Sequence, residues 1–183
     1  MIKEPIIQFV CFVTSLNPEQ FITEWERHAK KLAIKKNEAV LQTLTNQTKN
    51  KFRFISQHNW SGRDTAFSFM ENRKSENFPE LPVKVIHAGG YITIQAEQKK
   101  APAEGTVKLI AFISHNENDI EEYRTLSMYS SLNIHQAYYE SCLYGYILEF
   151  FVPEAQVTEL IAALKQHNGI EIGVYEDALL PHE

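Results

Sequence analysis

Apolar and polar residues follow two different periods along the chain, and the changes between them divide it into short strands and amphipathic helices. Apolar residues run almost without interruption through 6–13, which is typical of a strand buried on both faces. Over 18–33 the apolar residues, Phe21 and Trp25 among them, recur at helical spacing, and Asn17 is a good N-cap for that segment. The beginning of the chain therefore predicts a strand followed by a helix.

The rest of the chain continues this order and then repeats it. The first half adds predicted strands over 39–46, 51–59 and 83–95, with a helix that opens at 61–64 and includes 66–70. A polar segment with proline and glycine, 97–105, is the predicted linker. The second half predicts strands over 107–114, 134–142, 144–152 and 171–175, with helices that begin at 118–119 and span 154–167. Each half has the βαββαβ order of a ferredoxin-like unit.

A short sequence repeat supports two similar halves. Residues 9–15 match 109–115 at a constant offset of 100, apolar residue with apolar residue, until Thr14 meets Ser114. A four-stranded sheet with both helices on one face leaves its other face uncovered, and these strands carry aromatic residues on both sides. We therefore expect an α+β fold in which two ferredoxin-like βαββαβ repeats, 1–96 and 106–183, pack sheet to sheet as an intrachain pseudo-dimeric α/β barrel. A cavity between the two sheets would take a small ligand.

Composition narrows the partners and the compartment. The 183 residues include 18 basic and 23 acidic side chains, a net charge of −5, so the chain lacks the basic field that nucleic-acid binding requires. Two cysteines cannot form a disulfide framework, and there is neither a signal-peptide pattern nor an apolar segment of about 20 residues. We expect a cytoplasmic protein that does not enter a membrane. The histidines show no metal-binding spacing, so no metal is expected.

The end of the third predicted strand resembles a known family. Residues 53–60, Arg-Phe-Ile-Ser-Gln-His-Asn-Trp, lead straight into the helix at 64–70, and the apolar run 9–14 leads into Asn17-Pro18-Glu19. Over about 6–95 this resembles the antibiotic-biosynthesis-monooxygenase-like branch of the dimeric α/β-barrel superfamily, and the second half resembles it only in the order of its elements. The resemblance implies a cofactor-independent monooxygenase that acts on a small aromatic or polyketide-like substrate in a barrel cavity. Association into a further homodimer stays open.

Five residues are the predicted site. The resemblance assigns Trp60 to a wall of the substrate pocket. His58 and His87 are the predicted catalytic bases, because an imidazole with its ordinary pKa near ~6.5 can deprotonate a phenolic substrate. Asn59 and Tyr91 complete the predicted substrate-binding set. Each of these side chains also fits a structural role in a strand, as an apolar plug or a half-buried polar group.

Two alternatives remain from the sequence. One is a non-catalytic protein of the same fold that binds a small ligand or a partner. The other is a haem-binding relative, whose iron-ligating histidine the family pattern places on the second helix. This chain has Ala66, Phe67 and Met70 there, so no cofactor is expected. Cys11 and Cys142 lie among apolar neighbours, as buried non-catalytic cysteines do.

Overall fold

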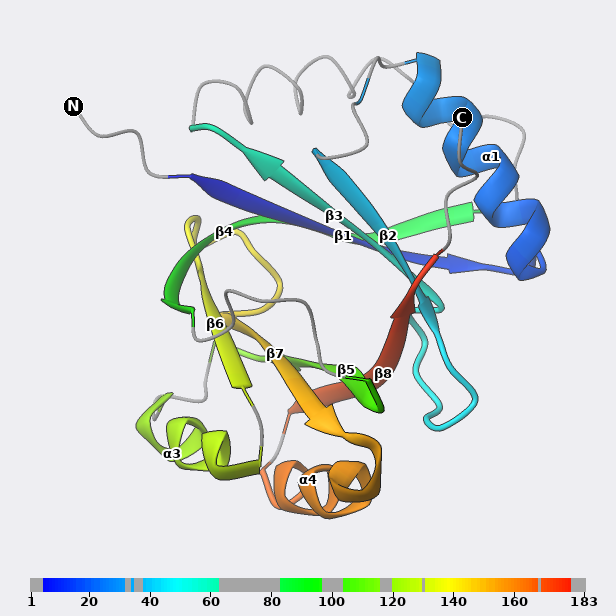
Figure 1. Cartoon of the computed structure of the whole chain (residues 1–183). Coiled ribbons are helices and arrows are strands. Elements are labelled where there is room, and N and C mark those ends of the chain that lie inside the picture. Colours follow the sequence, from blue (N-terminus) through cyan, green and yellow to red (C-terminus); the bar gives the residue numbers. More distant parts are fainter. Residues whose placement is uncertain are drawn as a thin grey trace.

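The described part of the chain is a closed barrel of antiparallel strands with helices outside it (Figure 1). The structure is a computed structural model, and it describes residues 5–31, 34, 38–62, 83–96, 104–115, 120–129, 131–167 and 169–178. The strands are β1 (Ile6–Thr14), β2 (Ala39–Leu44), β3 (Phe54–Trp60), β4 (Val83–Ala96), β5 (Thr106–Ile113), β6 (Ser131–Ala137), β7 (Tyr146–Pro153) and β8 (Ile170–Asp177). The helices are α1 (Pro18–Lys31), α3 (Ile120–Arg124) and α4 (Val157–Leu164). Around the barrel the strands follow the order β1-β3-β2-β8-β5-β7-β6-β4.

The predicted first helix is confirmed, and α1 begins with a reciprocal cap. The Asn17 side chain accepts a hydrogen bond from the Gln20 backbone N–H (2.9 Å), and the Gln20 side chain accepts one from the Asn17 N–H (3.3 Å). The helix buries Phe21 and Trp25 against the barrel. The predicted helix at 64–70, the residues 97–103 of the linker and the predicted helix start at 118–119 lie outside the described residues. None of the helices among the described residues is long and apolar enough to cross a membrane.

The strand prediction is wrong between β6 and β7, where the sequence predicted that the strands over 134–142 and 144–152 follow each other almost directly. The chain leaves the sheet after Ala137, whose N–H donates to the carbonyl of Gly145 (2.8 Å), while the next N–H, of Tyr138, donates to the carbonyl of Gly90 (2.9 Å). The loop that follows buries Cys142 and Tyr144 in the barrel interior. The loop is apolar because it closes one end of the barrel, and this is why its residues resemble a strand.

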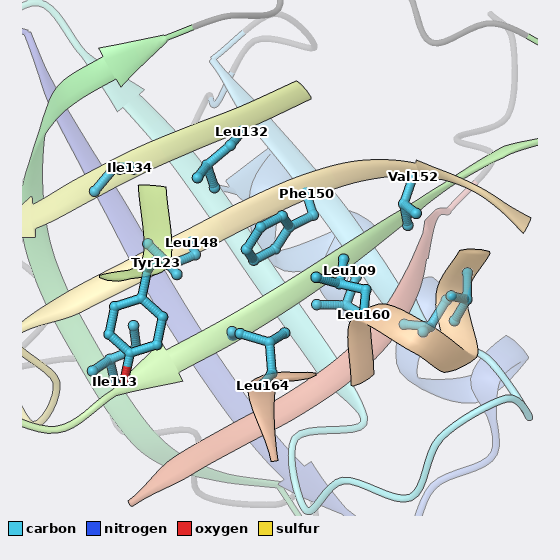
Figure 2. Packing of buried hydrophobic residues seen from close by; sticks show 13 residues of the cluster. Leu109, Ile113, Tyr123, Leu132, Ile134, Leu148, Phe150, Val152, Leu160 and Leu164 are labelled. Atoms are coloured by element: carbon cyan, nitrogen blue, oxygen red, sulfur yellow. The ribbon is translucent and has the colours of Figure 1, made fainter. Parts of the chain in front are cut away.

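Buried side chains form one cluster inside the barrel and two outside it. The interior cluster combines residues of both halves: Phe9, Cys11, Phe52, Ile55, Tyr91, Ile110, Phe112, Cys142, Tyr144, Ile147 and Tyr175. Outside, α1 packs on the strands of the first half through Phe21 and Trp25. Figure 2 shows the third cluster, in which Tyr123 of α3 and Leu160 of α4 cover the strands of the second half. The barrel wall therefore has buried apolar clusters on both faces.

The strand order is the same in β1–β4 as in β5–β8, and the cross-strand registers match too. Cys11 lies opposite Ile55 in one half, and Phe112 lies opposite Ile147 in the other. The matching interior positions Cys11 and Phe112 are 101 residues apart, so the offset of 100 expected from the sequence is wrong by one. In a strand, a slip of one residue exchanges the two faces, and the earlier offset would place interior Phe9 over outward-facing Leu109.

Candidate functional site

The five predicted site residues do not form one site. Side chains alternate along β3, so Ile55 points into the barrel while His58 and Trp60 lie on the outer face. On β4, His87 and Tyr91 both point inward, because Tyr91 belongs to the interior cluster and hydrogen-bonds with His87. The sequence did not determine which strand faces point inward, and the structure places the predicted residues on both faces. The wall of the barrel separates the two pairs.

The outer pair belongs to a group that we call the outer cluster: Gln8, Ser56 and His58, which are buried, and Trp60, which is half-buried. The His58 side chain is 2% exposed, and its ring lies parallel to that of Trp60, with centroids 5.9 Å apart and an interplanar angle of 3°. Ser56 Oγ and His58 Nε2 share a hydrogen bond of 2.6 Å. Trp60 Nε1–H donates to Gln8 Oε1 at 3.3 Å, and Gln8 lies opposite His58 in the sheet. These contacts fix the imidazole and the indole in one orientation.

The second half has only apolar residues at the corresponding positions. The register matches the outer cluster with Leu109, Leu148, Phe150 and Val152. These four side chains are fully buried and pack beneath α4, as Figure 2 shows. The fold therefore does not require polar groups on this face of a half. Burying them has a free-energy cost that hydrogen bonds only partly offset.

The inner pair, His87 and Tyr91, forms a chain of hydrogen bonds that ends at Tyr144, in the loop between β6 and β7. His87 Nε2 lies 2.8 Å from Tyr91 Oη, and the Tyr91 hydroxyl donates to the carbonyl of Tyr144 at 3.2 Å. Because that proton is committed to Tyr144, His87 Nε2–H is the donor to Tyr91. Burial lowers the pKa of His87 to about 4, so the ring is neutral near pH 7. Gly89 makes room for the contact, since a Cβ there would lie 2.6 Å from His87 Cε1.

The same arrangement occurs once more in the second half. Tyr175 donates to the carbonyl of Phe52 at 2.9 Å, across Gly173. A Cβ at Gly173 would lie 2.4 Å from a ring carbon of Tyr175. Burial raises the pKa of both Tyr91 and Tyr175, so both phenols stay protonated. Each tyrosine ties the loop of the opposite half to the barrel.

Asn59 lies apart from both pairs. It is exposed near the end of β3, and alternation places it on the face opposite Trp60. Its backbone N–H donates to the carbonyl of Glu38 at 2.8 Å.

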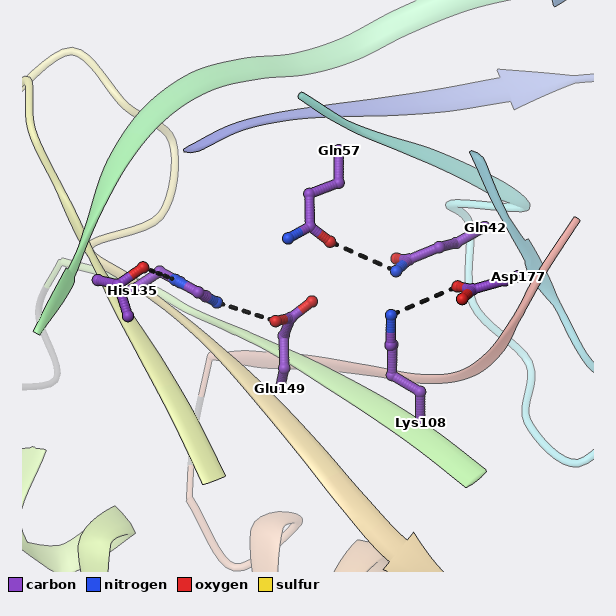
Figure 3. Close-up of polar contacts among 7 residues, drawn as sticks. Gln42, Gln57, Lys108, His135, Glu149 and Asp177 are labelled. Atoms are coloured by element: carbon purple, nitrogen blue, oxygen red, sulfur yellow. Dashed lines mark hydrogen bonds and ion pairs between the residues drawn. The ribbon is translucent and has the colours of Figure 1, made fainter. Parts of the chain in front are cut away.

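The other end of the barrel contains a set of polar side chains that the sequence did not predict, which we call the polar ring. Seven neighbouring strands contribute one residue each: Gln57, Gln42, Asp177, Lys108, Glu149, His135 and Thr93. Figure 3 shows its contacts, which include Gln42 Nε2–H donating to Gln57 Oε1 (3.4 Å), Lys108 Nζ donating to Asp177 Oδ1 (3.4 Å) and His135 Nε2 bonding Glu149 Oε2 (3.0 Å).

The centre of the polar ring is a buried charge. Glu149 is 3% exposed and His135 is 2% exposed. Burial raises the pKa of the Glu149 carboxyl, but opposing interactions, which include the hydrogen bond from His135 and the charge of Lys108, outweigh it and hold the pKa below its ordinary value. Glu149 is therefore ionised near pH 7. Its Oε1 atom and Oε1 of Gln42 are buried without a hydrogen-bond partner among the described residues.

The ring is neutral in one half and charged in the other. The register matches Gln42 with His135 and Gln57 with Glu149, so an amide pair in the first half corresponds to an imidazole–carboxylate pair in the second. One local signal in the sequence pointed here, because Glu149 interrupts an otherwise apolar strand. Among the described residues, no group of three or more His, Cys, Asp or Glu side chains is arranged to hold a metal ion.

Comparisons with known proteins identify the fold. No family model matches the chain, and no curated protein matches it. An anthrone oxidase-like protein of known structure superposes with a TM-score of 0.61 at 7% identity, over 97% of this chain and 92% of that chain. The chain has a dimeric α/β barrel-like fold. Two mutants of chlorite dismutase from Candidatus Nitrospira defluvii share it, with TM-scores of 0.57 and 0.56 at 9% and 10% identity, over 96% and 94% of this chain and 92% and 91% of those chains. Identities this low establish the fold alone.

Proposed function

We propose that this protein is a cofactor-independent oxidase or monooxygenase of a small aromatic or polyketide-like substrate, and that the outer cluster is its site. The observation that carries the proposal is the contrast between the halves. The first half has a buried serine, histidine and glutamine and a half-buried tryptophan where the second half has four buried apolar side chains. The name of the anthrone oxidase-like neighbour supports the same class of reaction.

The contacts assign a role to each member of the outer cluster. His58 is the general base that removes a proton from the substrate, and Ser56, 2.6 Å from its Nε2, orients the ring. Trp60 is a flat wall against which an aromatic substrate stacks, and Gln8 fixes the indole through its N–H. His87, Tyr91 and Asn59 are not part of this proposal, because none of them lies on the same face.

The reaction needs no added reductant. In an anthrone-type substrate a CH₂ group next to two aromatic rings becomes a carbonyl. One oxygen atom of O₂ forms the new C=O bond, and the other leaves as water with the two hydrogens of the CH₂ group. All electrons come from the substrate once a base has formed the carbanion. The protein supplies the base, the orientation and a site shielded from water.

We further infer that the chain is a tandem fusion of two repeats, 1–96 and 106–183, whose second repeat has lost the site. The repeated strand order, the matching registers and the two tyrosine contacts across the halves support this inference. The polar outer cluster in one repeat only is what such a loss would leave.

The test is oxygen consumption by the purified, metal-free protein with anthrone and a panel of hydroquinones. We expect turnover above the buffer rate, and a fall of about 10²-fold or more in His58→Phe, since a general base contributes about 10²–10⁴-fold. That variant and Trp60→Val carry the residues that the second half has at these positions, so the fold has a precedent for them. Gln136→Ala, an exposed change on β6, is the control.

Other outcomes would reject the proposal in favour of a named alternative. Ligand binding without oxygen uptake would support the small-ligand binder. A shift of the Soret band on adding haemin, with turnover only in its presence, would support the haem-binding protein. Equal activity in His58→Phe and the wild type would exclude His58 as the base.

A further inference from the structure

The charged side of the polar ring contains a hydroxyl, an imidazole and a carboxylate joined in series. Thr93 Oγ1 lies 3.0 Å from His135 Nδ1, and His135 Nε2 lies 3.0 Å from Glu149 Oε2. A carboxylate only accepts, so His135 Nε2 carries the proton and Nδ1 accepts from the Thr93 hydroxyl. This is the order of groups that activates a nucleophile: a hydroxyl bonded to a base, and the base oriented by a third group.

The three residues become more exposed from the carboxylate to the hydroxyl, as a site requires if the hydroxyl is to reach a substrate. Glu149 and His135 are almost fully buried, whereas Thr93 is exposed. The ring of Phe9 packs against the imidazole, with centroids 5.4 Å apart, and limits its rotation. The base and the group that orients it are therefore shielded from water, while Thr93, which carries the hydroxyl, is in contact with solvent.

A bulge in β4 directly follows the hydroxyl. The register with β6 shifts between Thr93 and Gln95, so Ile94 has no partner in the described β4–β6 pairing. Bulges take one residue out of the ladder and re-aim its neighbours. In acyl-transfer enzymes the backbone N–H of the residue after the nucleophile commonly binds the oxyanion. The Ile94 amide is the group in the corresponding position here.

The first half shows that the barrel does not need this arrangement. Where the second half has His135 and Glu149, the first half has Gln42 and Gln57, which hydrogen-bond to each other and contain no base. An amide pair fills the same interior positions without placing an ionised group in the core. The charged version therefore adds a chemical capability rather than a structural one.

From these contacts we infer a second activity, separate from the proposed oxidation: Thr93, His135 and Glu149 hydrolyse or transfer acyl groups from small esters. Thr93 Oγ1 forms a bond to the ester carbonyl carbon and passes its proton to His135 Nδ1. The tetrahedral intermediate then breaks its bond to the alcohol oxygen, which takes the proton back from His135. Water repeats the two steps on the acyl-threonine, releases the acid and restores the hydroxyl. Glu149 is a positioning residue in this scheme.

The experiment mixes the full chain with p-nitrophenyl acetate and follows release of p-nitrophenol, then maps the acetyl group by peptide mass spectrometry. We expect a burst of one equivalent and acetylation of Thr93. Thr93→Val should abolish both, Thr93→Ser should keep them, and Thr106→Val is the matched strand-threonine control. Glu149→Gln should lower the acetylation rate at saturating ester by about 10²–10⁴-fold without changing the half-saturating concentration, and Glu149→Asp should restore part of it.

The inference would be overturned by acetylation confined to other residues, or by a burst that survives in Thr93→Val. It would also be overturned if Glu149→Gln, folded as judged by circular dichroism, acetylated Thr93 at the wild-type rate. None of these measurements uses oxygen. Their outcome is therefore independent of the oxygen-consumption experiment that tests the proposed oxidase activity.

Discussion

Replacing the His135–Glu149 pair by two glutamines should leave the protein nearly as stable as the wild type, although replacing one partner alone should not. The first half already places Gln42 and Gln57 at the matching positions, joined by a hydrogen bond of 3.4 Å. We therefore expect His135→Gln/Glu149→Gln to change the free energy of unfolding by about 1 kcal/mol or less, the scale of one neutral hydrogen bond.

His135→Leu alone should be far more damaging. It leaves the Glu149 carboxylate, 3% exposed, with neither Oε1 nor Oε2 hydrogen-bonded to an imidazole. Leaving a buried charge without its hydrogen-bonding partner costs about 3–5 kcal/mol. That is a large fraction of the roughly 5–15 kcal/mol that stabilises a domain. The single variant changes one residue and the double variant changes two. If the single variant is the less stable of the two, the loss comes from the unpaired charge and not from the number of residues replaced.

Urea denaturation at pH 7, followed by tryptophan fluorescence and circular dichroism, measures the free energy of unfolding of both variants. The pH dependence supplies a second readout. The pKa of Glu149 is depressed in the folded state, so the pair stabilises the protein above the ordinary carboxyl pKa of about 4.5, and this contribution is lost as the pH falls through the folded value. The double variant should lack that loss. A double variant as unstable as His135→Leu would refute the equivalence of the two halves of the ring.

Three further predictions concern stability. His87 has a pKa of about 4 in the folded state against 6.5 ordinarily, so the free energy of unfolding should fall by about 3 kcal/mol as the pH falls from 6.5 to 4. In urea titrations at a series of pH values, His87→Leu should remove this dependence on pH. An unchanged dependence in the variant would exclude His87 as its cause. Gly89→Ala should lower the stability by about 1–3 kcal/mol, because the new Cβ displaces His87 and breaks its bond to Tyr91; an unaltered melting temperature would contradict this packing. Gly105→Ala, with φ +77° and no atom within 4 Å of its Cβ, should cost only the backbone strain of about 1–2 kcal/mol, and a larger loss in calorimetry would show that contacts are involved.

Local patterns in the sequence were sufficient for most elements but not for their faces. The Asn17 cap and the spacing of Phe21 and Trp25 determine α1, and the apolar run at 6–13 determines β1. The same run hides its orientation, because a strand that is apolar at every position does not alternate. Phe9 points into the barrel and Val10 points out, and only the register with β3 and β4 decides this.

For the candidate sites too, the sequence places neighbouring side chains relative to each other but does not show which face of the barrel wall they lie on. His58 and Trp60 are two residues apart, so a strand places them on one face without further information, and the same holds for His87 and Tyr91. That the two pairs lie on opposite sides of the sheet depends on how the barrel closes.

The polar ring required pairing over longer distances. His135 and Glu149 are 14 residues apart and meet across β6 and β7, and Thr93 and His135 are 42 residues apart. A strand-to-strand register of this kind has no local signature. The one local clue was Glu149 itself, a charged residue between two buried apolar residues.

The most direct test of the proposed oxidation is turnover of anthrone by the metal-free protein under heavy-isotope oxygen gas, with a buffer control for spontaneous oxidation. We expect that the new carbonyl oxygen derives from the gas, that turnover exceeds the buffer rate, and that His58→Phe loses this excess. Consumption of anthrone no faster than in buffer, or label that enters only from water, would contradict it.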